Sequence, residues 1–358
     1  MRKFLFLCLA GSSLATVTTQ SSYPSRGILT DTRSLDEIYA AASTESGELT
    51  VLWGGDAPSQ ASGVVSAWKA KFPNIPLNLT VDVSKYHDSR VDREFQKSGS
   101  DGADIAILQT VHDFDRWKRA GRLLSYKPAG WDNIYSSIKD PSGAYTPLFI
   151  NGFGNIIYNT ERLQESQVPS RYDAFVDPFW KGKLALTYPN DDDAIAFLFV
   201  QIIEKYGWDW LESLAQQDIQ WVRGTQTPGD ILSYSNSTRS ITFTTSRTSQ
   251  NTAIKIPEDG RMSWPQSGAI FATSQHRESA KLFMSWLLSD EAQKTFSRQY
   301  SVRKDLGTPG NNTVWDDPTT GVTQFSNFMS NRELVEWWKL QFETTLGTPQ
   351  GVDPVKTY

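Results

Sequence analysis

Three consecutive carboxylates, Asp191, Asp192 and Asp193, separate a predicted strand at 184–188 from the helix that follows it. Carboxylates at a helix start cap backbone N–H groups and interact favourably with the positive end of the helix dipole, so stability alone explains much of the cluster. If one or two of them face a cleft, they favour a cationic ligand such as an amine, a thiazolium or a metal, and they oppose a free anion.

The loop of Trp53, Gly54, Gly55 and Asp56 is a second candidate site, because it follows a β-rich run at 48–53. Its glycines allow a ligand to approach the backbone, its indole offers a stacking face, and Asp56 can bind a cation. The alternative is a tight strand-to-helix turn with Trp53 in the core, and the sequence leaves both interpretations open.

Neutral side chains at other predicted strand ends are candidates for hydrogen bonds to a ligand. They are Gln109, Thr110, Thr244, Thr245, Ser246, Trp264 and Gln266.

Signatures of catalysis are missing from the chain. No G-x-S-x-G, P-loop or G-x-G-x-x-G motif occurs, and nothing singles out the carboxylate pair of a glycoside hydrolase. His87, His112 and His276 are isolated in the sequence, so we interpret each as a surface or structural residue rather than a metal ligand. We therefore expect no enzyme, catalytic residue, cofactor or metal site.

Predicted strands and helices alternate along the chain, which favours a mostly parallel α/β sheet with right-handed crossovers. In such sheets ligands bind beyond the carboxyl ends of the strands, which points to the loops after Trp53 and Leu108. The predicted strands lie at 48–53, 76–83, 103–108, 154–159, 184–188, 240–245 and 269–272, and the predicted helices at 34–42, 64–72, 88–97, 112–120, 194–203, 280–288 and 333–344.

Length and charge limit the class of protein. A chain of 358 residues suggests two domains or one elaborated domain. With 35 Lys+Arg against 40 Asp+Glu the net charge is −5, and the basic residues are scattered, which disfavours a nucleic-acid partner. We expect a monomer.

The first residues predict a secretory signal peptide. Arg2 and Lys3 precede an apolar run at 4–10, and small residues permit cleavage after Ala15. The run is too short to span a bilayer, so we expect no stable membrane insertion. Cleavage would remove Cys8, the single cysteine, and would leave a cysteine-free chain with a net charge of −7.

Three N-x-[ST] sequons, at Asn78, Asn236 and Asn311, would be used only in a eukaryotic secretory pathway. With the signal peptide they favour a secreted, extracellular glycoprotein.

Six stretches together resemble the bacterial-type extracellular solute-binding proteins of ABC importers, in the group that binds ferric iron, polyamines and thiamine. In chain order they are 47–53 (GELTVLW), 103–108 (ADIAIL), 121–126 (GRLLSY), 177–186 (DPFWKGKLAL), 267–271 (SGAIF) and 278–293 (ESAKLFMSWLLSDEAQ). The resemblance implies a two-lobed α/β fold of the periplasmic-binding-protein type II kind, in which crossing strands join the lobes and the lobes close on a ligand. Together with the three sequons, the resemblance indicates a secreted eukaryotic, fungal-like member of this family.

The resemblance also implies domain boundaries. Lobe one comprises 47–150 plus 268–315 and lobe two comprises 155–266, after the signal peptide (1–15) and a Ser/Thr-rich leader (16–46). The C-terminal helices at 316–358 pack across both lobes. Gly152, Gly154, Pro265 and Gly268 punctuate the chain where the crossings are expected.

One departure from the family bears on the ligand. Ferric-iron members carry a tandem tyrosine pair after the strand equivalent to 240–243, where this chain reads TFTTS at 242–246. Ferric-iron binding is therefore disfavoured.

We conclude from the sequence that the chain is a secreted, non-catalytic binder of a small polar, cationic solute such as an amine or a thiamine-like compound. Two alternatives remain: an interaction protein on the same fold that binds no small molecule, and a glycan-active hydrolase. The sequence does not identify a membrane transporter partner.

Overall fold

The computed structural model describes residues 28–297, 300–307 and 313–355. The predicted signal peptide with Cys8, and the sequon residue Asn311, lie outside the described residues. Asn78 and Asn236 are exposed.

Lobe one is built on a mixed sheet in the order β2-β1-β3-β11-β4, with β5 also paired to β11. Strands β1 (Leu49–Gly54), β2 (Leu77–Asp82) and β3 (Ile105–Leu108) are parallel. Strand β11 (Met262–Phe271) runs antiparallel to β3, to β4 (Leu123–Leu124) and to β5 (Thr146–Phe153).

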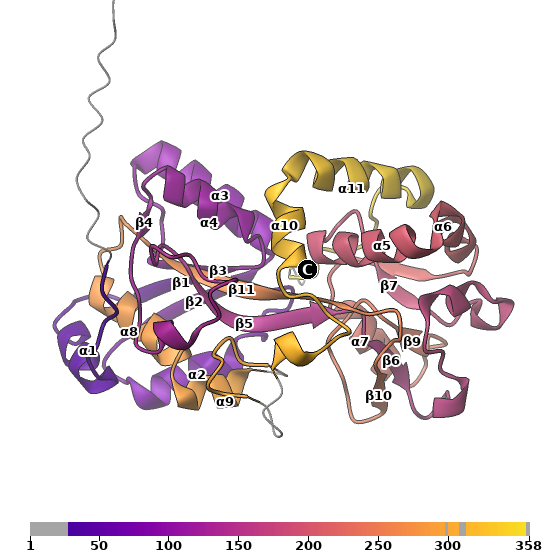
Figure 1. The fold of residues 1–358 in the computed structure, drawn as a ribbon, viewed down its shortest axis with the longest axis horizontal. Helices are drawn as coiled ribbons and strands as arrows, with labels where there is room; N and C mark the ends of the chain where they lie inside the picture. The colour runs from indigo at the N-terminus through magenta and orange to yellow at the C-terminus, as the bar shows by residue number, and fades with distance from the viewer. Residues whose placement is uncertain (1–27, 298–299, 308–312, 356–358) are drawn as a thin grey trace, which may run out of the picture.

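Helices cover both faces of this sheet (Figure 1). Below it in the view lie α1 (Leu35–Ala42), α2 (Ser62–Lys71), α8 (Arg277–Leu287) and α9 (Asp290–Phe296), and above it lie α3 (Ser84–Ser98) and α4 (His112–Arg119). Ile38 of α1 is fully buried in the same cluster as Trp68 and Phe283, so a helix from the expected leader segment packs into the core of lobe one.

Lobe two contains two small sheets. Strand β6 (Ile156–Asn159) pairs antiparallel with β9 (Ile241–Thr242) and β10 (Thr252–Lys255), and β7 (Ala185–Thr187) pairs parallel with β8 (Gln220–Val222). Its helices are α5 (Asp193–Tyr206), α6 (Trp208–Ala215) and α7 (Thr227–Ser233). Short 3₁₀ helices of the chain lie at Trp131–Asn133, Glu165–Gln167, Tyr172–Val176, Pro178–Trp180 and Val314–Asp316.

Strands β5 and β11 run from one lobe into the other (Figure 1). Their antiparallel pairing extends from Met262 opposite Phe153 to Gly268 opposite Thr146. Near this crossing, α10 (Gln324–Ser330) contacts β11, α4 and α5, while α11 (Arg332–Leu346) packs on α5 and α6. The predicted two-lobed α/β fold is confirmed, and its sheets are mixed because β5, β11 and most lobe-two pairings are antiparallel.

A buried ion-pair network fixes α3 against the sheet of lobe one. The Arg122 guanidinium donates to Asp101 at 2.9 Å and to Asp92 at 2.7 Å, and lies 4.2 Å from the centre of the Phe95 ring. Arg122 and Asp101 are both buried. Removing one partner of such a pair leaves an uncompensated charge away from water.

We predict that Arg122→Met lowers the free energy of unfolding by about 3–5 kcal/mol, because Asp101 is left buried without its partner. Urea denaturation measures this. Arg171→Met, which breaks an exposed pair with Asp173, is the control and is expected to change little. Equal effects of the two substitutions would contradict the prediction.

Candidate functional site

A cavity of about 80 Å³ lies between the lobes. Its walls come from the loop after β1, the starts of α3 and α5, the crossing strands, and the segments before α7 and after β9. Nine of the residues predicted from the sequence line it: Gly54, Gly55, Asp56, Gln109, Asp192, Thr245, Ser246, Trp264 and Gln266.

The glycine loop approaches its neighbours closely. A Cβ atom at Gly54 would lie 2.1 Å from Ser84 Oγ and 3.2 Å from the Ile107 carbonyl oxygen, so a side chain there would clash. Trp53 does not line the cavity; its ring packs 5.5 Å from that of Phe149, centre to centre, in the core. The sequence left open whether Trp53 faces a ligand or packs in the core, and the structure places its indole in the core.

Asp56 reaches across the cleft from lobe one to the segment that precedes α7. Its Oδ2 accepts hydrogen bonds from Thr225 Oγ1 at 2.6 Å, from Gln226 N at 3.2 Å and from Thr225 N. A carboxylate with three donors from the opposite lobe is an interlobe contact as well as part of the cavity wall.

Asp192 caps α5 and faces the cavity. Its Oδ1 accepts from Ala194 N at 2.8 Å and Ile195 N at 3.0 Å, and Gln109 Nε2 donates to it from lobe one at 3.3 Å. Burial raises the pKa of Asp192 to about 6, helped by the negative charges of Asp193 and Asp56. The expected capping role and the expected cavity position thus fall on the same residue.

Asp191 and Asp193 do not line the cavity, and each is neutralised by two cations. Asp191 pairs with Lys85 at 2.9 Å and Arg223 at 3.0 Å. Asp193 pairs with Arg332 and Lys339, both at 3.0 Å. Burial opposes ionisation of both aspartates, but these cations hold the pKa of each below its usual value.

Thr110 and Thr244 do not line the cavity either. Thr244 Oγ1 accepts from Thr187 N at 2.9 Å, which ties β7 to the segment after β9. Both threonines are buried. The structure therefore does not bring these two hydroxyls, or Trp53, Asp191 and Asp193, to the cavity surface.

The crossing strands form the cavity floor. Gln266 Nε2 donates to the Gly54 carbonyl oxygen at 3.3 Å, and its Oε1 accepts from Asn151 Nδ2. The Trp264 and Phe153 rings lie 5.3 Å apart, centre to centre. These contacts hold the glycine loop of lobe one against the strands that lead into lobe two.

Sequence reasoning missed half of the lining. The missed residues are Gln60, Val83, Ser84, Asn151, Gly152, Phe153, Thr225, Gln226 and Arg247. Gly152 was the partial exception, because the sequence placed it at a crossing between the lobes, where a Cβ atom would lie 2.6 Å from the Met262 carbonyl oxygen. Thr225 and Gln226 precede a seven-residue helix that the pattern did not reveal.

Further contacts between the lobes lie beside the cavity. Lys85 of α3 meets Asp191 of lobe two, and Arg223 of lobe two donates to Tyr86 Oη at 3.1 Å. With the Asp56 and Gln109 hydrogen bonds, these contacts place the lobes in a closed arrangement around the cavity.

The sequence model of a family described as "Bacterial extracellular solute-binding protein" matches residues 100–313, more than half of the chain. An uncharacterized protein from Haemophilus influenzae is 26% identical over 195 residues, covering 50% of this chain. The match spans 56% of that relative, so the chain matches only about half of its length.

Solved structures share the fold at low sequence identity. The periplasmic binding protein AfuA from Actinobacillus pleuropneumoniae, with fructose-6-phosphate bound, has a TM-score of 0.65 at 17% identity, with 83% of this chain and 99% of that chain covered. The substrate binding protein of an ABC transporter from Agrobacterium tumefaciens has a TM-score of 0.69 at 14% identity, with 86% and 96% covered. Iron-bound HitA from Pseudomonas aeruginosa has a TM-score of 0.61 at 17% identity, with 84% and 100% covered.

In the described part of the chain, no helix combines the length and the apolar character needed to cross a membrane.

We predict that Asp56→Ala shifts the lobes towards an open arrangement, because three donors on lobe two lose their common acceptor. Hydrogen bonds to charged groups contribute about 1.5–3 kcal/mol each, so the closed population is expected to fall at least tenfold relative to the open one. Small-angle X-ray scattering without solute measures this as a larger radius of gyration. Glu204→Ala, on the exposed side of α5, is the control. If the scattering curves of Asp56→Ala and of the unmodified protein coincide, the Asp56 hydrogen bonds do not hold the lobes together.

Proposed function

Since the chain belongs to the family of bacterial extracellular solute-binding proteins, we propose that it captures a small, polar, cationic solute in the cavity between its lobes. Closure of the lobes around the solute would exclude water and set selectivity. The relatives of known structure hold chemically different solutes, fructose-6-phosphate in one case and iron in another, so the choice of solute rests on the cavity wall.

The observation that carries this proposal is the charge balance of the wall. Asp56 and Asp192 both line the cavity, and within the described residues neither forms an ion pair with Lys or Arg. The wall holds one basic residue, Arg247, whose Nε pairs with Asp230. The wall thus carries two carboxylates without a countercharge, whereas its guanidinium is already paired with a carboxylate. At low dielectric this balance favours a cationic solute.

Cavity size and wall chemistry support an organic cation. The cavity volume of about 80 Å³ suits a small amine better than an oligosaccharide. The amide side chains of Gln109, Asn151 and Gln266 supply neutral hydrogen-bonding groups. Tyrosine is missing from the wall formed by the described residues, which supports an amine over phenolate-ligated ferric iron.

Location and partners follow from the same proposal. The family is extracellular, which supports an extracellular or periplasmic site of action and a membrane transporter as the recipient of the solute. We propose a monomer that performs no catalysis and uses no cofactor. Secretion by cleavage after Ala15 and glycosylation at Asn78, Asn236 and Asn311 remain predictions.

We predict that putrescine, or another compound from a panel of amines and thiamine, raises the unfolding temperature of the unmodified protein. At a concentration of 1,000 times Kd, binding to the folded state adds about 4.1 kcal/mol to the free energy of unfolding. Asp192→Asn should weaken binding at least tenfold, because it removes one uncompensated carboxylate from the wall. Glu204→Gln, exposed on α5, is the matched control.

Other results identify the alternatives. Stabilisation by sugar phosphates but by no cation would overturn the choice of a cationic solute. No shift with any amine, thiamine, sugar, phosphate or metal would favour the interaction protein. Turnover of a glycan that one carboxylate substitution abolishes would favour the hydrolase.

The affinity for a cation is also predicted to depend on pH. With a pKa of about 6, Asp192 carries its charge above that pH and a proton below it. A bound cation stabilises the charged carboxylate, so affinity should be full above pH 6 and should decrease as the pH falls through that value. Titration calorimetry between pH 5 and 8 measures this, and the dependence should disappear in Asp192→Asn.

A further inference from the structure

We propose that Asp88, His112 and Asp113 form a divalent-cation site on lobe one, outside the interlobe cavity, that binds Zn²⁺. The site is independent of the proposed solute-binding function, because none of its residues lines the cavity. Asp88 comes from α3, and the other two residues open α4. A bound ion would cross-link the two helices on the same face of the sheet.

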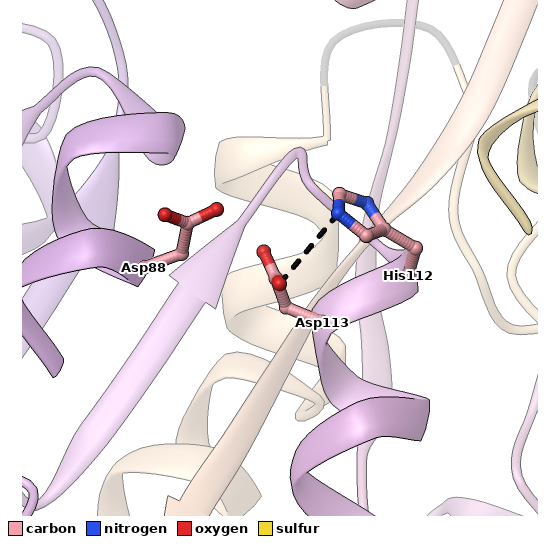
Figure 2. Close-up of side chains that lie close together, drawn as sticks. All are labelled: Asp88, His112 and Asp113. Carbon is pink, nitrogen blue, oxygen red and sulfur yellow. Dashed lines mark ion pairs between the residues drawn. The ribbon is translucent and has the colours of Figure 1, made fainter. Parts of the chain in front are cut away.

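Asp88, His112 and Asp113 each place one possible ligand atom close to those of the other two. The three atoms lie within 4.8 Å of one another, and His112 Nε2 is 3.6 Å from Asp113 Oδ1. In Figure 2 the Asp88 carboxylate, the Asp113 carboxylate and the His112 ring turn towards a shared space between the helices. One imidazole nitrogen and two carboxylate oxygens make a donor set that Zn²⁺ accepts, with a fourth tetrahedral position left for water.

Unsatisfied polar atoms at this place indicate a missing partner. Asp113 is 1% exposed, and its Oδ2 has no hydrogen-bond donor among the described residues. The buried Nδ1 of His112 is likewise without a partner there. A buried acceptor without a donor is destabilising, and a cation would remove that cost for the carboxylate.

The charges around Asp88, His112 and Asp113 are compatible with a bound cation. Arg116 compensates one carboxylate, since it donates to Asp113 Oδ1 at 2.7 Å and pairs with Asp92. Burial and the nearby Asp113 carboxylate raise the pKa of Asp88 to about 7, against the opposing effects of Ser89 and Arg116. The two carboxylates repel each other when both are charged, and a metal ion between them would remove that repulsion.

His112 is suited to be the nitrogen ligand. Burial lowers the pKa of its imidazole, with smaller opposing effects from Asp113 and, across the lobes, from Asp193, while Arg332 and Arg116 add to the lowering. The neutral imidazole is the form that ligates a metal ion, and burial favours that form. Of the three histidines that the sequence left isolated, His112 is the one that lies in a cluster with two carboxylates, because folding brings Asp88 to it and Asp113 follows it in the chain.

Titration calorimetry of the full chain with ZnCl₂ at pH 7.5 tests the site. We expect binding of one Zn²⁺ per chain, weakened at least tenfold by Asp88→Asn and by His112→Gln. Asp115→Asn is the matched control, because its exposed carboxylate lies on α4 and contacts Tyr145 instead. Equal affinities for all four proteins, or no binding to the unmodified protein at 1 mM Zn²⁺, would overturn the proposal.

Two further measurements separate loss of a ligand from loss of the fold. Asp88→Asn removes the repulsion between the Asp88 and Asp113 carboxylates, so the metal-free variant should unfold at an unchanged or higher urea concentration. Anomalous X-ray scattering at the zinc edge should place the ion within about 2.0–2.2 Å of the three ligand atoms, and a peak elsewhere would contradict the assignment.

Discussion

Two antiparallel strands, β5 and β11, carry the chain between the lobes, and the placement of nearly every other element depends on their pairing. Every residue of β11 is buried, and the strand pairs with β3, β4 and β5 along its length. The same two strands supply Asn151, Gly152, Trp264 and Gln266 to the cavity floor. A site built on strands that belong to both lobes keeps its floor when the lobes move, so only the walls change with closure.

The three adjacent aspartates show how local geometry assigns different roles to identical side chains. Asp191 and Asp193 face cations of other elements, whereas Asp192 turns towards the helix start and the cavity. Neutralised carboxylates stabilise the fold but contribute little field to a ligand, because their countercharges lie within ion-pair distance. Asp192, the residue without a cation, is the one whose charge a ligand in the cavity would meet.

Much of the fold could be predicted from the sequence, because hydrophobic periodicity and glycine positions report directly on buried strands and helix ends. The strand–loop–helix unit around Gly54 and the capping role at Asp192 are examples. Thr225 and Asn151 could not be predicted, since they join the cavity through contacts with residues more than 100 positions away. The same limit applies to His112, which is isolated in sequence but meets Asp88 only after α3 and α4 pack on one sheet face.

The hydrogen bonds of Asp56 with Thr225 and Gln226 have a kinetic consequence. They join the lobes with the protein's own groups. Under the proposed function, a solute would have to wait for these contacts to break before it could enter, and the observed association rate would level off at the rate of opening instead of rising with concentration. The same contacts would delay escape after capture. Their strength would therefore govern residence time as well as affinity.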